Sequence, residues 1–202
     1  MKVLLTGFEP FSEYTINPSQ LLVDSLPDQY QDLFLTKCIL PVDHHQAPPM
    51  LFDAIHNHQP DAVVSFGLAS GRAKISLERI AVNLLDFSIE DNSGTKIENQ
   101  PIVEQGPAAY FSSLPFHTML AGLNQGGIPA ELSLSAGAFL CNQVFYLLMH
   151  QVESLNKPIQ AGFIHLPALP EQSAANNQPT PSMSMEHVKK VAFIILDNLN
   201  RI

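Results

Sequence analysis

A cysteine in the second half of the chain stands between two apolar segments. Residues 130–133 predict a strand, and residues 142–152 repeat apolar side chains at the spacing of a helix with one buried face. Cys141 would then lie near a helix N-terminus, where unpaired amides and the helix dipole favour an anion. The same amides can donate to an oxyanion. The position of Cys141 therefore predicts a nucleophile whose thiol pKa is lowered. The alternative is a buried structural cysteine, because free cysteine packs as a small hydrophobe.

A thiol nucleophile requires an imidazole that takes and returns its proton, and a third group that orients the imidazole. His165 suits the first role because it stands near the C-terminal end of an expected strand, residues 159–166. Glu78 suits the second because it interrupts an apolar extended segment, residues 75–85, where an unpartnered carboxylate would be costly to bury. Two alternatives stay open. Glu78 could form a simple surface pair with Arg79, and His165 could be a core histidine bonded to backbone.

Two phenylalanines, Phe8 and Phe11, follow the first expected strand and are separated by Glu9 and Pro10. A loop that follows a strand is a common place for groups that contact a ligand. Their position is therefore as consistent with an aromatic wall for a ligand as with ordinary core packing.

Metal and nucleotide sites have weaker support in the sequence. His44 and His45 are adjacent, and His56 and His58 are two apart, so neither pair shares a helix face. No cysteine or carboxylate stands near them at ligand spacing, and we expect no metal ion. The first strand is followed by neither a glycine-rich dinucleotide fingerprint nor a Walker lysine, and we expect no cofactor.

Composition limits the remaining possibilities. The chain has 202 residues, of which 46% are hydrophobic and 14% charged, and this predicts one domain spanning residues 1–202. A formal charge of −9 would repel a phosphate backbone, so nucleic acid is not an expected partner. No segment has the length and apolar character of a signal peptide or a membrane span, and two cysteines are too few for a disulfide framework. We expect a cytoplasmic protein with reduced thiols and no membrane partner.

The order of the expected elements indicates the fold class. Apolar strand candidates alternate with helix candidates along most of the chain, and residues 86–106 form a polar, turn-rich hairpin or excursion. This alternation predicts an α/β protein, a three-layer α/β/α sandwich around a mostly parallel, twisted mixed sheet. Binding sites in such sheets lie beyond the carboxyl ends of the strands. Phe8, Leu68, Cys141 and His165 would all fall near that edge.

Five ordered blocks of this sequence resemble pyroglutamyl peptidase type I, also called pyrrolidone-carboxylate peptidase, a family of cysteine peptidases. The resemblance covers nearly the whole chain. Its blocks are Thr6-Gly7-Phe8-Glu9-Pro10-Phe11 with Asn17-Pro18-Ser19, Gly67-Leu68-Ala69 with Gly71-Arg72, Ile75-Ser76-Leu77-Glu78-Arg79-Ile80-Ala81-Val82-Asn83, Ser135-Ala136-Gly137 with Cys141-Asn142, and Gly162-Phe163-Ile164-His165 with Pro170-Glu171-Gln172.

The resemblance implies a catalytic triad of Cys141, His165 and Glu78, the three residues that the chemistry also indicates. It implies removal of N-terminal pyroglutamate from a peptide through a thioester acyl-enzyme, without metal or cofactor, by an enzyme that is often a homotetramer.

The resemblance also implies how the substrate is recognised. Phe8 and Phe11 would sandwich the lactam ring, and main-chain groups near Leu68 and Leu140 would bond its N–H and C=O. Such a pocket suits a small, flat, uncharged ring that has one donor and one acceptor.

This chain departs from the family pattern at three places. Ser88 stands where an arginine is usual, and Leu134 and Ala168 replace a polar residue and a tyrosine. An alternative function follows from these departures: a catalytically weak relative that binds a cyclic amide or a peptide N-terminus without efficient turnover.

Overall fold

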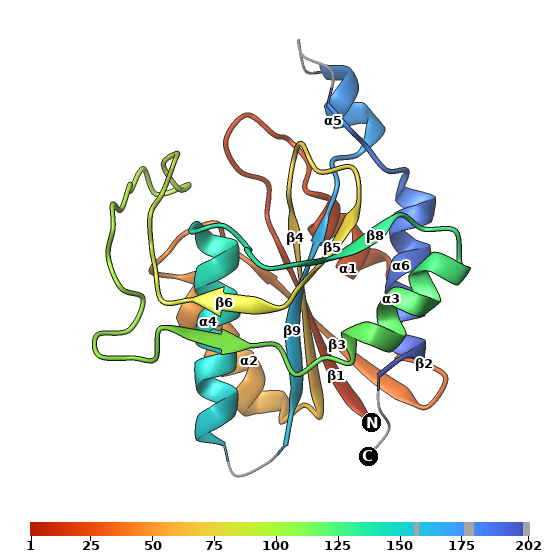
Figure 1. Cartoon of the computed structure of the whole chain (residues 1–202), viewed down its shortest axis with the longest axis horizontal. Helices are drawn as coiled ribbons and strands as arrows, with labels where there is room; N and C mark the ends of the chain where they lie inside the picture. The colour runs from red at the N-terminus through yellow and green to blue at the C-terminus, as the bar shows by residue number, and fades with distance from the viewer. Residues whose placement is uncertain (156–157, 176–179, 200–202) are drawn as a thin grey trace.

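The computed structural model describes residues 1–155, 158–175 and 180–199, and within them one seven-stranded sheet forms the centre of the molecule (Figure 1). Its strands lie in the order β2-β3-β1-β4-β9-β5-β8. β3, β1, β4 and β9 are parallel, β2 is antiparallel to β3, and β5 runs antiparallel to β9 but parallel to β8. Their bounds are β1 (Lys2–Phe8), β2 (Gln29–Tyr30), β3 (Leu33–Leu40), β4 (Ala62–Leu68), β5 (Ile75–Glu78), β8 (Ala130–Ser133) and β9 (Gln160–Leu166). The mostly parallel mixed sheet expected from the sequence is confirmed.

Helices cover both faces of this sheet. α1 (Pro18–Ser25), α3 (Phe116–Gln125) and α6 (Met185–Asp197) pack on one face, whereas α2 (Ala47–His58) and α4 (Leu140–Ser154) pack on the other (Figure 1). Along β1, Val3 and Leu5 belong to the first core and Leu4 to the second, as the two-residue period of a strand requires. A short helix, α5 (Pro170–Ala175), follows β9. The expected three layers are therefore present.

The segment after β5 departs from its expected form. Residues 75–85 were expected to be one extended stretch, but β5 ends at Glu78 and a separate strand, β6 (Ile80–Val82), pairs with β7 (Ala109–Phe111) in a two-stranded sheet. Asn142 explains the change of direction. Its buried side chain accepts from the amide of Val82 and donates to the carbonyl groups of Val82 and Leu84, and this holds β6 against α4.

Residues 86–106 form an excursion beside α4 rather than a regular hairpin (Figure 1). One isolated bridge, between Leu85 and Gln100, closes its base. In the part of the chain that the structure describes, no helix has both the length and the apolar character needed to cross a bilayer.

Candidate active site

Sheet register brings His165 and Glu78 together. Ser76 pairs with His165 and Glu78 with Phe163 across the antiparallel β5–β9 pair. Residues two apart in a strand share a face, so Glu78 and His165 are diagonal neighbours on the α4 side of the sheet. His165 Nδ1 lies 2.8 Å from Glu78 Oε1, and both residues are buried. The antiparallel insertion of β5 thus places a carboxylate beside the imidazole.

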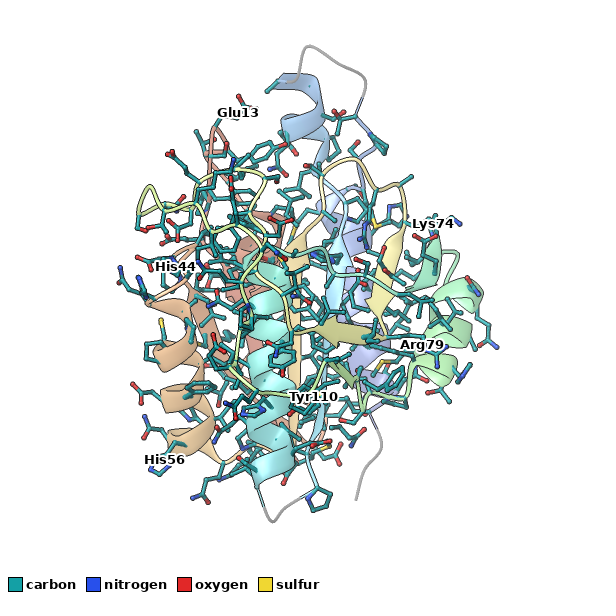
Figure 2. All side chains as sticks on the ribbon, turned by 60° about the vertical axis from the view of Figure 1, so that its left-hand side comes forward. Glu13, His44, His56, Lys74, Arg79 and Tyr110 are labelled. Carbon is teal, nitrogen blue, oxygen red and sulfur yellow. The ribbon has the colours of Figure 1, made fainter. Side chains whose placement is uncertain are left out.

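The Glu78 carboxylate is paired with the Arg72 guanidinium and hydrogen-bonded to His165, and Arg79 is not among these partners. The Arg72 Nη1 donates to Glu78 Oε1 at 2.5 Å, and the same oxygen contacts His165. Arg79 is exposed and lines a different cavity beside α3 (Figure 2). The surface-pair interpretation of Glu78 is therefore wrong, because Glu78 is 0% exposed.

The environment keeps Glu78 ionised. Burial raises its pKa, but the hydrogen bond and charge of His165, the Ser133 hydroxyl and Arg72 outweigh burial and leave the pKa below its ordinary value. The second oxygen, Oε2, has no partner at good hydrogen-bond geometry, so Ser133 interacts with the carboxylate only loosely. An ionised carboxylate only accepts, and His165 Nδ1 must therefore carry the proton in this pair. That leaves Nε2 free to act as a base.

The surroundings of His165 keep its imidazole neutral. Burial lowers its pKa, the hydrogen bond and charge of Glu78 raise it, and the Arg72 charge lowers it again, with a net value below the ordinary one. A histidine whose pKa is lowered is unprotonated at neutral pH. The interpretation of His165 as a core histidine bonded to backbone does not hold, since its Nδ1 bonds to a carboxylate.

Cys141 lies in the first turn of α4, as the sequence predicts, and is partly exposed where it faces a cavity. A Cβ atom built on Gly67 would lie 2.9 Å from Cys141 Sγ and 2.8 Å from the Phe163 ring. The thiol therefore approaches the β4 backbone at a distance that only glycine permits. Gly67 appeared in the sequence only within a family motif, and the close approach of the sulfur to it follows from the fold.

The protonation state of Cys141 differs from the sequence-based expectation. Burial raises its pKa to about 12, and the Glu78 charge adds to this, whereas the Arg72 charge and the amide of Cys141 itself lower it. The helix amide acts in the predicted direction, but burial outweighs it because protein atoms crowd the sulfur even where the residue is partly exposed. The thiol without substrate is neutral.

A cavity of about 370 Å³ joins these groups to the expected binding residues. It is lined by Phe8, Phe11, Asn17, Val42, Leu68, Ala69, Ser70, Arg72, Ser88, Ala136, Gly137, Phe139, Leu140, Cys141 and His165. All four predicted substrate-binding residues, Phe8, Phe11, Leu68 and Leu140, are among them, and the sequence-distant strand ends meet at one edge as expected.

Phe8 and Phe11 differ in their surroundings. Phe8 is 3% exposed and packs on Phe163 with ring centroids 6.3 Å apart, so it belongs to the core as well as to the cavity wall. Phe11 is half-buried, and its ring centroid lies 6.3 Å from that of Phe139. The Phe139 ring centroid in turn lies 4.6 Å from that of Phe87. Phe139 completes this wall, and no sequence signal distinguished it from an ordinary core residue.

Hydrogen bonds from the excursion fix the loop that carries Phe11. The side-chain amide of Asn92 donates to Glu9 Oε1 and to the Pro10 carbonyl, both at 3.0 Å. Glu9 Oε1 also accepts from the Val42 amide, and the Asn92 amide donates to the Val42 carbonyl. Three of these bonds tie the Phe11 loop to the excursion and to the segment after β3, and the fourth joins the excursion to that segment.

The three departures from the family pattern lie in different environments. Ser88 is exposed and lines the cavity. Leu134 is 68% exposed and Ala168 is buried, and neither is among the residues that line the cavity. Only Ser88 can affect the site directly.

One cluster has the residue types of a metal site. Asp43, His44 and Asp91 are buried within reach of one another. Donors already occupy each carboxylate: Asp91 accepts from His44, Ser93 and Thr95, and Asp43 accepts from His45 and Gln46.

An ion in this cluster would have to displace these donors, so the cluster is better described as a hydrogen-bonded anchor for the excursion. His56, by contrast, lies at the far end of α2 from His44 (Figure 2).

The fold and the site define a class: an α/β protein in which a helix-start cysteine and a buried histidine line one ligand-sized cavity, with a carboxylate bonded to the histidine. A family model described as pyroglutamyl peptidase matches residues 1–197. The chain belongs to this peptidase family, and the resemblance noted in the sequence is confirmed.

Relatives and solved structures agree with this membership. The chain is 48% identical to the pyrrolidone-carboxylate peptidase of Vibrio vulnificus over 92% of its own length and 86% of that protein. It superposes on a mutant pyrrolidone carboxyl peptidase from Pyrococcus furiosus with a TM-score of 0.95 and 41% identity, covering 98% of both chains. The pyroglutamyl peptidase I of Bacillus amyloliquefaciens gives 0.94 at 37% identity, covering 98% of this chain and 94% of that one.

Proposed function

We propose that this protein is a cysteine-type ω-peptidase that removes N-terminal pyroglutamate from peptides, with Cys141 as nucleophile, His165 as general base and acid, and Glu78 as orienting group. The observation that carries the proposal is geometric: the 2.8 Å contact between His165 and Glu78 lies behind the cavity that Cys141 and the two phenylalanines line. Membership of the pyroglutamyl peptidase family supports the substrate class.

Acylation begins with a neutral Cys141 thiol and a neutral His165 imidazole. His165 Nε2 takes the proton of the Cys141 thiol as sulfur attacks the pyroglutamyl carbonyl carbon, so the raised thiol pKa requires proton transfer coupled to attack. Unpaired amides at the start of α4 donate to the oxyanion that forms. Collapse of the tetrahedral intermediate breaks the C–N bond, and the imidazolium gives its proton to the leaving amine. A thioester remains on Cys141.

Deacylation repeats these roles, with water as the nucleophile and the Cys141 sulfur as the leaving group. His165 Nε2 takes a proton from water, the resulting hydroxide attacks the thioester carbonyl, and the proton then goes to the departing sulfur. The ionised Glu78 stabilises the imidazolium formed in each half of the cycle.

Recognition in this proposal follows the cavity. The lactam ring lies between Phe8 and Phe11, and main-chain groups near Leu68 and Leu140 bond its N–H and C=O. The cavity volume of about 370 Å³ exceeds that of the ring and leaves room for the start of the leaving peptide. No charged side chain is needed, because pyroglutamate lacks a free amine.

One assay tests the proposal. A fluorogenic pyroglutamyl amide is compared with prolyl and glutamyl amides, before and after treatment with iodoacetamide. We expect turnover of the pyroglutamyl compound alone and its loss after alkylation. Turnover that survives modification of Cys141, verified by mass spectrometry, would contradict the proposed mechanism.

A second candidate, a weak relative that binds a cyclic amide or peptide N-terminus with little turnover, is favoured by the raised pKa of Cys141 and by Ser88 in the cavity. Binding of free pyroglutamate without hydrolysis of its amide would support it.

We further expect a cytoplasmic homotetramer, as the family resemblance suggests. Light scattering on the purified protein tests the tetramer, and a mass other than four chains would contradict it.

A further inference from the structure

Arg72 connects two parts of the site that are far apart in the sequence. It follows β4 in a tight turn, where its amide donates to the Ala69 carbonyl, and its side chain is 31% exposed at the cavity. Nη1 donates to Glu78 Oε1 at 2.5 Å, and Nη2 donates to the Ser135 carbonyl at 2.9 Å. One rigid guanidinium therefore bridges β5 and the loop before α4.

The Ser135 carbonyl belongs to the loop that leads into the nucleophile. Cys141, the second residue of α4, follows six residues later, and Ala136, Gly137 and Phe139 of this loop line the cavity. Gly137 has a φ of +79°, and its amide donates to the Ser135 hydroxyl. Such local bonds hold the loop, and its Ala138 carbonyl accepts from the Asp86 amide of the excursion. Arg72 in addition ties the loop to the Glu78–His165 pair.

We propose that Arg72 is a positioning residue of this site, which holds the Glu78 carboxylate and the loop that leads into Cys141 in a fixed relation to each other. The inference rests on the function proposed above. It deepens that function by assigning a role to a residue outside the nucleophile, base and orienting carboxylate.

The Arg72 charge has a second, separable effect. Among the described residues that line the cavity, Arg72, Cys141 and His165 carry the charged or titratable groups, and Glu78 lies directly behind them. The positive charge lowers the pKa of both Cys141 and His165. It therefore favours the thiolate and keeps the imidazole available as a base. Loss of this charge raises both pKa values. The pH dependence of kcat/KM and the pH dependence of Cys141 alkylation should therefore both move to higher pH.

Two variants separate the bridge from the charge. Arg72→Lys keeps the charge, but a single ammonium lacks the planar fork that reaches both oxygens. Arg72→Gln removes the charge as well. Arg79→Gln is the matched control. Arg79 is the next residue after Glu78 in the sequence, but it is exposed and lines another cavity.

Three readouts are measured on each full-length variant: kcat and KM for a pyroglutamyl amide, the pH dependence of kcat/KM, and the pH dependence of Cys141 alkylation by iodoacetamide. We expect Arg72→Lys to lower kcat about tenfold, with KM changed by less than about threefold and both profiles in place. Arg72→Gln should lower kcat by about tenfold to a hundredfold and move both profiles upward by up to about one pH unit. Arg79→Gln should match the wild type.

Added guanidinium provides a direct check of the bridge. Arg72 is partly exposed at the cavity, so a guanidinium ion at about 10–50 mM can reach the vacated position in Arg72→Ala. We expect it to restore several-fold activity to this variant and to leave the wild type unchanged.

Wild-type kcat and unmoved profiles in Arg72→Gln would overturn the inference and reduce Arg72 to a simple ion pair. If Arg72→Gln fails to fold, Arg72→Lys decides, since equal kcat to wild type would show that the bridge is dispensable. A wild-type protein that does not hydrolyse the amide would instead contradict the proposed function. The alkylation profiles would still report whether Arg72 acts on Cys141.

Discussion

The proposed catalytic groups and the aromatic wall of the cavity lie on different kinds of element. Glu78 and His165 project from adjacent strands, and Cys141 lies in the first turn of α4, which Asn142 holds against β6. Phe11 and Phe139 instead lie on loops. Sheet register sets the positions of strand residues, whereas the position of a loop depends on the side-chain hydrogen bonds that hold it. The proposed catalytic groups thus lie on strands and a helix, whereas Phe11 depends on the bonds that Asn92 and Val42 make to its loop.

The largest effect should come from the nucleophile. Cys141→Ala removes the sulfur and little volume, so we expect turnover to fall about ten-thousandfold or more while the fold stays intact. Turnover and the melting temperature are measured together. His165→Ala should be similarly disabling. Residual activity above about one per cent of wild type in Cys141→Ala would refute the assigned mechanism.

The orienting carboxylate comes next. Glu78→Gln keeps an acceptor but loses the charge that stabilises imidazolium, and its amide can present N–H to His165 and favour the wrong tautomer. We expect kcat to fall by about a hundredfold to ten-thousandfold, less than for Cys141→Ala. Glu131→Gln, on the neighbouring strand β8 and partly exposed, is the control and should retain wild-type kinetics. Equal kinetics for Glu78→Gln and wild type would leave the carboxylate without a catalytic role.

The packing beneath the nucleophile gives a third test. Gly67→Ala places a methyl group where only 2.9 Å separates it from Cys141 Sγ, so the sulfur or Phe163 must move. Because a displacement of about 1 Å can cost about a hundredfold in rate, we expect kcat to fall tenfold to a hundredfold. Gly122→Ala is the control. Its added Cβ would lie equally close to a side chain, 2.9 Å from Asn198 Nδ2, but on the opposite face of the sheet. If both variants lose stability alike and neither loses kcat, the approach at Gly67 serves packing alone.

Substitution of Phe8 and of Phe11 should have different effects on KM and on stability. Phe11→Ala removes a half-buried wall, and we expect KM to rise about fivefold, corresponding to about 1 kcal/mol of ring stacking, with little change in stability. Phe8→Ala should also raise KM but in addition cost about 3–5 kcal/mol in free energy of unfolding, because Phe8 packs in the core. KM for the amide and urea unfolding of both variants test this difference. Unchanged KM in both would make them core residues only.

The sequence predicted the groups on strands and helices better than the aromatic wall on loops. The buried strand Gln160–Leu166 and the helix-start position of Cys141 follow from local pattern. The pairing of β5 between β9 and β8 does not, because register between distant strands depends on the whole sheet. For the same reason Arg72 could not be distinguished from Arg79 as the partner of Glu78.

The wall and the thiol ionisation depend on tertiary burial. Phe139 reads as one more apolar residue before a helix, and only the fold shows that it joins Phe11 and Phe87. The predicted effect of the helix N-terminus on Cys141 is real but smaller than that of burial, and burial around a sulfur atom cannot be estimated from a periodic pattern.

Ser88 gives the smallest and most specific test, because it is the one departure from the family pattern that lines the cavity. The Cys141 pKa is raised to about 12, so the thiolate fraction at neutral pH is small and grows as the pH increases. A guanidinium at position 88 would favour the thiolate and lower this pKa. One pKa unit corresponds to about 1.4 kcal/mol, so Ser88→Arg should gain at most about tenfold in alkylation rate near neutral pH.

Position 88 is exposed, and solvent screening should reduce this gain to about threefold and make it shrink as salt is added. The measurement is the pH dependence of iodoacetamide alkylation at Cys141 in a Cys38→Ser background, which removes the second thiol. Ser88→Gln is the control for a larger side chain without charge. Its alkylation curve should coincide with that of the protein that retains Ser88. If the Ser88→Arg curve also coincides with wild type, a charge at position 88 does not reach the sulfur. Arg72 would then be the cation that adjusts Cys141 from within the cavity, as its bonds to Glu78 and Ser135 already favour.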